Sequence, residues 1–149
     1  MRVYLVIMDE TEEARKALRF ASRRAAATGG SVHILALVQP QNFNAFGGVQ
    51  ATIEQEAHDR AEAIATSAAG NLFSESGKMP TIAVRVGEGQ AVIKAYLTDH
   101  KEVAALVLAA AESNPGPLVA HFSANAGNLP CPLYVIPGTF TTEDIDRLT

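Results

Sequence analysis

The amino-acid sequence predicts an α/β fold, in which a doubly wound sheet of five parallel strands carries helices on both faces. Three observations predict it. Five short apolar runs alternate with stretches whose apolar residues recur at helical spacing. The runs are mostly apolar along their whole length, which is typical of strands covered on both faces. The chain has 149 residues, of which 48% are hydrophobic, and this fits a single packed domain over residues 1–149.

The first strand is expected over Arg2–Met8. Asp9 follows it, with Glu12 three positions later, and this spacing predicts a capping box at the start of a helix. The helix is expected to run to about Thr28, because the glycine pair at 29–30 supplies a left-handed stop.

Val32–Val38 is expected to form the second strand, and residues 49–73 a long amphipathic helix. The loop between them, Gln39–Gly48, is long for a plain connector. It contains Phe43 and Phe46, and so it can serve as a lid over a crevice or as a docking surface. The alternative is that both rings fold down onto the helix that follows.

The second half of the chain repeats the alternation. Its expected elements are, in chain order, a strand at Ile82–Val86, a helix carrying Val92 to Leu97, a strand at Val103–Leu108, a short helix from Leu118 to about Ala126, a strand at Pro132–Ile136 and a capped terminal helix from Thr141. Consecutive parallel strands of this kind require right-handed crossovers.

The charge balance argues against a nucleic-acid partner, because the net charge is −4 and nucleic-acid binding proteins typically carry a clustered basic face. The basic residues that gather in the chain are Arg15, Lys16, Arg19, Arg23 and Arg24. At helical spacing they form the solvated side of one helix, and the alternative is a patch that docks a polyanion.

The cysteine count and the first residues predict a cytoplasmic protein that does not associate with membranes. Cys131 is the single cysteine, and so the chain has no internal disulfide that would need an oxidising compartment. The first apolar run is too short to span a membrane and lacks the cleavage pattern of a signal peptide.

A ligand crevice is expected where the first and fourth strands end, because strands of an open parallel sheet finish together at one edge. Asp9 would face the loop that begins at Ala109. In that loop, Asn114 and Gly116 can form a modest anion nest with the N–H groups that open the next helix, although Pro115 and Pro117 remove two donors. The alternative is a simple Pro-Gly turn that closes the crevice.

In segment 6–21 a strand ends in Asp9 and the helix that follows carries an Ala-Leu-x-x-Ala face, and Cys131–Pro137 joins a Cys-Pro pair to the last apolar run. These two ends resemble the opening and the last strand of the universal stress protein family. The resemblance implies a Rossmann-like five-stranded sheet, a role in surviving stress, and a homodimer joined through Pro132–Ile136. An edge strand with unpaired backbone groups independently favours a two-fold partner, and the alternative is that the tail 139–149 covers the same edge.

The resemblance also implies where a nucleotide would bind. ATP-binding members carry a glycine, two residues, a second glycine, nine residues, and a glycine followed by Ser or Thr after the fourth strand. Here Ala109 opens the matching stretch and Glu112 stands at the second glycine, so that this motif is absent in its usual form. Side chains and a like charge at these positions predict weak triphosphate binding. The resemblance implies that Asp9 contacts the adenosine part of the nucleotide; the alternative is that Asp9 only caps a helix. It also implies that the backbone of Leu37 and Val38 meets adenine; the alternative is that both residues only contribute core side chains.

Catalytic and metal chemistry are not predicted. The four histidines have no metal-ligand spacing with cysteines or carboxylates. Ser113 lacks a nucleophile elbow and Cys131 lacks an evident base. Gly87–Gly89 lacks the third glycine of a dinucleotide fingerprint and is read as a turn.

The sequence therefore predicts a non-enzymatic, universal stress protein-like dimer that acts by association and requires no cofactor. Its crevice is a degenerate nucleotide site comprising Asp9, Leu37, Val38, Ala109, Asn114 and Gly116. The alternative function is a sensor that holds ATP or another adenine nucleotide in the crevice beside Asp9.

Overall fold

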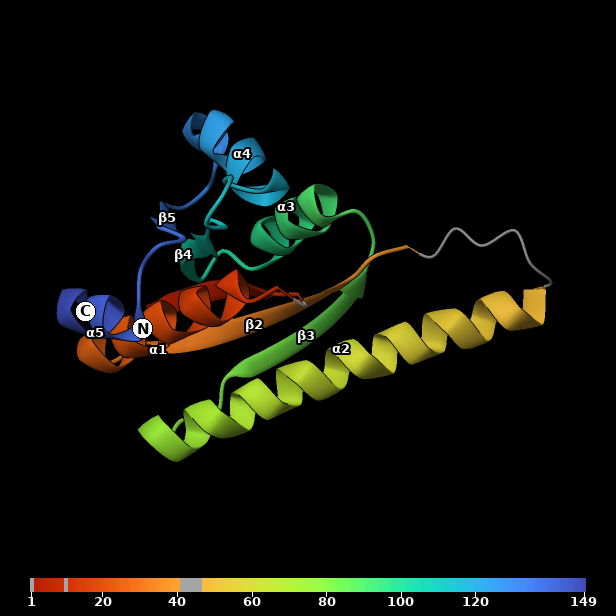
Figure 1. Cartoon of the computed structure of the whole chain (residues 1–149), viewed down its shortest axis with the longest axis horizontal. Helices are drawn as coiled ribbons and strands as arrows, with labels where there is room; N and C mark the ends of the chain where they lie inside the picture. Colours follow the sequence, from red (N-terminus) through yellow and green to blue (C-terminus); the bar gives the residue numbers. More distant parts are fainter. Residues whose placement is uncertain (1, 10, 41–46) are drawn as a thin grey trace.

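The computed structural model describes residues 2–9, 11–40 and 47–149 (Figure 1). Its elements are β1 (Val3–Met8), α1 (Glu13–Thr28), β2 (Ser31–Val38), α2 (Gly47–Ser76), β3 (Thr81–Val86), α3 (Gly89–Asp99), β4 (Val103–Ala109), α4 (Pro117–Ala124), the short 3-10 helix η1 (Ala126–Asn128), β5 (Leu133–Ile136) and α5 (Thr142–Leu148). All strand pairs are parallel and the sheet order is β3-β2-β1-β4-β5. The predicted α/β fold with five parallel strands is confirmed.

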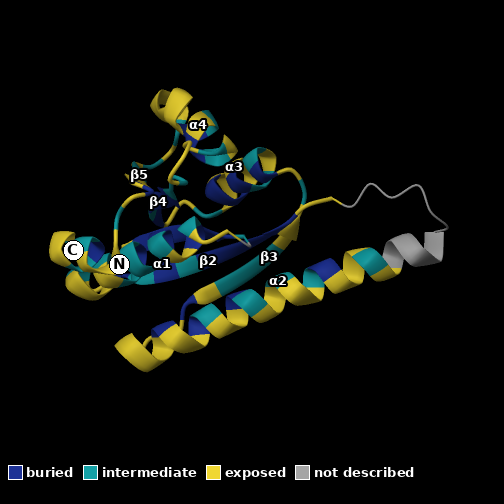
Figure 2. Ribbon diagram, in the orientation of Figure 1, coloured by how far each residue is buried: buried dark blue, intermediate teal, exposed yellow. Residues whose placement is uncertain are grey.

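The side chains of β1 alternate between two hydrophobic cores, one on each face of the sheet. Tyr4, Val6 and Met8 pack with residues of α1, α2 and α5, whereas Leu5 and Ile7 pack with residues of α3 and α4. Figure 2 shows this central strand region as buried, with exposed residues on the outer surfaces of the helices. The almost uniformly apolar strands are explained by this burial on both faces.

The predicted capping box at Asp9 and Glu12 is wrong. Helix α1 begins only at Glu13, and Glu12 at its N-cap has a helical backbone and makes no capping bond through its side chain. Asp9 instead follows β1 directly, and its Oδ1 accepts hydrogen bonds from the backbone N–H of Thr11 at 3.0 Å and from the hydroxyl of Thr11, which lies in a bend before the helix. This local turn leaves Asp9 at the end of the strand. The predicted stop is confirmed, since Gly29 ends α1 with φ of 69°.

Helix α2 is longer than the predicted helix at both ends. It begins at Gly47 and passes through Gly70, and it stops before Gly77, whose φ is 73°. Figure 1 shows this helix running alongside β3 and extending beyond the sheet. Residues 41–46, including Phe43 and Phe46, lie outside the described residues, and so the predicted lid or docking role of the loop stays a prediction.

The C-terminal segment packs on α1 after β5 has ended. Thr141 and Asp144 form a capping box at the start of α5, and the capped terminal helix predicted from Thr141 is confirmed. Ile145 is 1% exposed in the core below α1. Arg19 binds Asp146 through two nitrogens at 2.8 and 2.7 Å. Helix α5 lies beside α1 (Figure 1), and β5 remains an edge strand of the described sheet, at the end opposite β3.

No helix within the described ranges combines the length and the hydropathy that a membrane crossing needs.

Candidate nucleotide site

The site is built where β1 and β4 end side by side. Their register pairs Leu5 with Leu106 and Val6 with Val107, so that the two strands finish at the same edge of the sheet. From this edge the chain leaves β1 for α1 on one face and leaves β4 for α4 on the other. Such a divergence of consecutive connections is where open α/β sheets form their ligand crevices. The predicted proximity of Asp9 to the loop after Ala109 is therefore confirmed.

A first hollow of about 150 Å³, the β4-side hollow, opens between α1 and α4. Asp9 lies on its rim, and its other lining residues come from β1, β4, the first turns of α1 and α4, and the loop before α4: Ile7, Thr11, Glu13, Ala14, Ala17, Leu108, Ala109 and Pro115–Val119. Of the predicted site residues, Asp9, Ala109 and Gly116 meet here.

A second hollow of about 220 Å³, the α2-side hollow, lies on the other side of Asp9. It is bounded by the ends of β1 and β2 and by one face of α2: Met8, Asp9, Leu37, Val38, Gln39, Ala57, Arg60, Ala61 and Ile64. Asp9, Leu37 and Val38 meet here as predicted. The Val38 carbonyl already accepts a hydrogen bond from the backbone N–H of Gly87 at 3.1 Å.

Asp9 is the residue that the two hollows share, and its side chain is half-buried. Its Oδ1 is occupied by Thr11. Among the described residues, no hydrogen bond reaches Oδ2. The carboxylate is thus held in one orientation by the turn and keeps an oxygen that can accept hydrogen bonds from a ligand hydroxyl.

The loop before α4 uses its own donors. Gly116 has φ of 83°, and its N–H donates to Oδ1 of Asn114 at 3.0 Å. The Asn114 amide in turn donates to Oγ of Ser113 at 3.3 Å. Asn114 lines neither hollow, and so its side chain closes the loop instead of facing the crevice. Proline at 117 has no N–H, which leaves the first-turn N–H groups of Leu118 and Val119 for an anion.

The space next to the β4-side hollow is acidic. It is lined in part by three carboxylate residues, Glu12, Glu13 and Glu112, and by a single cation, Lys16. The Lys16 ammonium donates a hydrogen bond to the carbonyl oxygen of Gly138. An extended polyphosphate placed along this side would meet a net negative surface, and it would be repelled because like charges repel.

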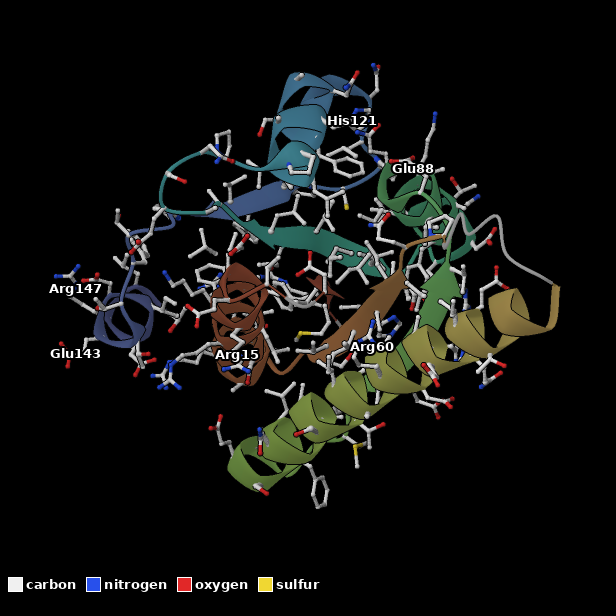
Figure 3. All side chains as sticks on the ribbon, turned by 45° about the vertical axis from the view of Figure 1, so that its right-hand side comes forward. Arg15, Arg60, Glu88, His121, Glu143 and Arg147 are labelled. Carbon is white, nitrogen blue, oxygen red and sulfur yellow. The ribbon has the colours of Figure 1, made fainter. Side chains whose placement is uncertain are left out.

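Two elements contribute wall residues that sequence reasoning did not assign to the site. Arg60 and Ile64 of α2 face the ends of β1 and β2 in the α2-side hollow, and Leu118 of α4 closes the β4-side hollow. Figure 3 shows Arg60 on the side of α2 turned toward the sheet. Arg60 stands in a polar stretch of the sequence, and helical spacing alone does not tell which polar residue turns inward.

Two other reactive groups in the described part of the chain lie outside the crevice. Burial raises the pKa of the Cys131 thiol, which favours the unreactive protonated form. His58, Asp59 and Glu62 bring ligand atoms within 4.8 Å of one another, but all three lie along one surface of α2 and the two acids are exposed. The Asp59 carboxylate also accepts a hydrogen bond from the Gln55 amide at 2.8 Å, as expected for a solvated helix face.

Comparisons with known proteins agree with this architecture. A sequence model described as the universal stress protein family matches residues 1–137. No curated protein sequence is significantly similar to the chain. Among solved structures, the chain resembles the universal stress protein UspA from Lactobacillus plantarum with a TM-score of 0.78 and 18% identity, covering 91% of this chain and 97% of that one.

Two further similar structures contain a ligand. A universal stress protein from Archaeoglobus fulgidus in complex with dAMP has a TM-score of 0.54 and 16% identity, covering 91% of this chain and 97% of that one. A universal stress protein family protein from Arabidopsis thaliana with AMP bound has a TM-score of 0.59 and 13% identity, covering 92% of each chain. At these identities the likeness establishes the shared fold.

Proposed function

This chain belongs to the universal stress protein family, and we propose that it is a stress-response protein that binds an adenine nucleoside monophosphate in the crevice at Asp9. The observation that carries the proposal is the place of Asp9 on the boundary between two hollows, with one carboxylate oxygen fixed by Thr11. The similar structures with AMP and with dAMP support the choice of ligand class.

In the proposed complex, the base enters the α2-side hollow and lies against the ends of Leu37 and Val38 with Ile64 above it. The ribose hydroxyls donate to Oδ2 of Asp9. The phosphate enters the β4-side hollow, where the free N–H groups at the start of α4 and the positive end of that helix favour an anion.

A single phosphate fits these residues better than three. Gly116 spends its N–H on Asn114, and Pro117 supplies none, so that few backbone donors remain. A longer polyphosphate would extend past Glu13, which already lines the β4-side hollow, toward Glu12 and Glu112. The glycine-poor loop therefore supports selection of a monophosphate.

The protein is further proposed to work by association and not by catalysis, as a cytoplasmic homodimer joined through β5. Val135 of this edge strand is 38% exposed. The unpaired backbone N–H and C=O groups of an edge strand can pair with a second chain, and such a two-fold partner would also cover Val135. Occupation of the crevice would then change which partner proteins the dimer binds.

Isothermal titration of the protein with AMP, ADP and ATP tests the proposed ligand. AMP is expected to bind about fivefold or more tightly than ATP, because the glutamates repel the additional phosphates of ATP more strongly than the few extra contacts of those phosphates favour binding. Asp9→Ala is expected to weaken AMP binding about tenfold, since it removes a charged hydrogen-bond acceptor. Asp99→Ala removes an exposed carboxylate at the end of α3 and should leave AMP binding unchanged.

If none of the three nucleotides binds, the proposed ligand is wrong, and only the proposal that the protein works by association remains. Tighter binding of ATP than of AMP would refute the argument from the glycine-poor loop. An equal loss of affinity in both carboxylate variants would contradict a direct contact between Asp9 and the ligand.

The dimer is tested separately by light scattering after size-exclusion chromatography. The parent chain is expected to elute as a dimer and Val135→Glu as a monomer, because the new charge would be buried in the contact. A monomeric parent chain would contradict the proposed use of β5.

A further inference from the structure

A third hollow lies between α3 and α4 at the end of the sheet opposite Asp9. It has a volume of about 630 Å³ and reaches the first residue of β4, Val103, whereas the nucleotide crevice lies beyond the last residue of that strand. Its volume is within the range of about 300–1,000 Å³ that is usual for small-molecule sites. It is also larger than either hollow beside Asp9.

The wall of this α3–α4 hollow is apolar and firmly held. Leu97, Val103 and Phe122 belong to the buried core on this face of the sheet, and Leu129 packs against the same core. Because these side chains are anchored in the core, they offer a preformed surface to an apolar ligand.

The rim of the hollow carries cationic groups and no acidic ones among its lining residues. Lys94 and Lys101 line it from α3 and from the turn that follows, and neither forms an ion pair with another residue in the described ranges. Asp99 and Glu102 lie on the same stretch of chain but do not line the hollow. A local excess of positive charge in a protein of net charge −4 favours an anionic ligand.

Two histidines complete the rim. The ring of His100 is stacked on Tyr96, with centroids 3.8 Å apart, and its Nδ1 lies 3.0 Å from the Tyr96 carbonyl oxygen. This contact orients the ring and leaves Nε2 for other partners. His121 enters from α4, and Figure 3 shows it on the side of that helix turned toward α3.

We propose that the α3–α4 hollow binds an amphipathic organic anion, with its apolar body against Leu97, Phe122 and Leu129 and its carboxylate or equivalent acid group at Lys94 and Lys101. An apolar cavity with a few polar groups converging at one side is the usual design of a site for such ligands. This site is separate from the nucleotide crevice and does not depend on nucleotide binding.

Displacement of a fluorescent anion tests the ligand class. Anilinonaphthalene sulfonate is first bound to the native protein, and decanoate or decanol is then added as competitor. Decanoate is expected to displace the dye at a concentration about fivefold or more below that of decanol, because only the acid can pair with the lysines. The double variant Lys94→Gln, Lys101→Gln is expected to lose this preference.

A matched control removes two positive charges elsewhere. Arg15→Gln, Lys78→Gln changes the net charge equally at positions outside the hollow and should keep the preference for decanoate. Thr98→Trp places a bulky ring on the exposed face of α3 that lines the hollow and is expected to abolish decanoate-sensitive dye binding.

Three outcomes would overturn the proposal: equal displacement by decanoate and decanol, equal loss of preference in the two charge variants, or undiminished binding in Thr98→Trp. Failure of the dye to bind the native protein at all would also overturn it.

Discussion

Gly138 provides a sharp test of how the chain packs beside the crevice. It follows β5, and a Cβ added to it would lie 2.5 Å from the carbonyl carbon and oxygen of Ala111 and 2.6 Å from the carbonyl oxygen of Ala110. Its own carbonyl accepts the hydrogen bond from Lys16 of α1. Gly138→Ala therefore forces the segment after β5 away from the loop after β4, and this movement also strains the hydrogen bond from Lys16 of α1.

The cost follows from these distances. Carbon atoms pack best at about 3.5–4.0 Å, so that the new methyl group must move about 1 Å away from Ala111. All three close atoms belong to the backbone, and no side chain can rotate aside. Overpacking of this kind costs about 1–3 kcal/mol, and the rigid neighbours place Gly138→Ala in the upper half of that range. In a chain of this length the melting temperature falls by about 2–4 °C for each kcal/mol.

Urea unfolding followed by circular dichroism, at matched protein concentration, measures this effect. Gly70→Ala is the control, because Gly70 lies within α2 and a methyl group added to it would meet no other atom within 4 Å. It is expected to raise the free energy of unfolding by about 0.5–1 kcal/mol, since alanine favours a helix over glycine. A Gly138→Ala protein within about 0.5 kcal/mol of the parent, the usual range of neutral surface changes, would refute the close approach at Ala111.

Three further predictions concern single side chains. Glu88 accepts hydrogen bonds from the N–H groups of Gln90 and Ala91, both at 3.1 Å, so Glu88→Ala should lower the free energy of urea unfolding by about 1 kcal/mol, and an unchanged value would contradict the cap. Burial lowers the pKa of His33, so that the folded protein favours the neutral ring more than the unfolded chain does. The stability that neutral His33 contributes should be complete above about pH 6.5 and be lost as the pH falls through the lower pKa of the folded state. Unfolding measured between pH 7.5 and 5.5 should therefore show a smaller loss of stability in His33→Gln than in the parent, and equal losses would count against this role. Burial raises the pKa of Cys131, so its alkylation by iodoacetamide at pH 8 should be much slower in the folded protein than in urea; equal rates would show an accessible thiolate.

The fold was predictable mainly because the three central strands β1, β2 and β4 are mostly apolar and buried on both faces. The edge strands β3 and β5 are only partly buried, but their alternation with helical segments also placed them within a few residues. The start of α1 was not predicted correctly. Asp9 and Glu12 have the spacing of a capping box, but the chain makes an additional bend before the helix begins. Whether a carboxylate caps a helix or a turn depends on backbone direction, which spacing does not encode.

The candidate site was predictable where topology determines it. The right-handed crossovers place Asp9 beside the loop after Ala109, and the strand order confirms it. The position of Asn114 was not predictable in this way. Its side-chain amide forms hydrogen bonds with Gly116 and Ser113 within the loop, and these bonds depend on the conformation of the turn between β4 and α4. Arg60 could not be assigned, since the angle at which α2 crosses the sheet decides which of its polar residues reaches β2.

The most direct test of the central claim is a crystal structure of the protein grown with AMP. The base is expected beside Val38 and Ile64, the ribose hydroxyls within hydrogen-bond distance of Oδ2 of Asp9, and the phosphate at the start of α4. AMP bound away from Asp9, or with its phosphate among Glu12 and Glu112, would contradict the account.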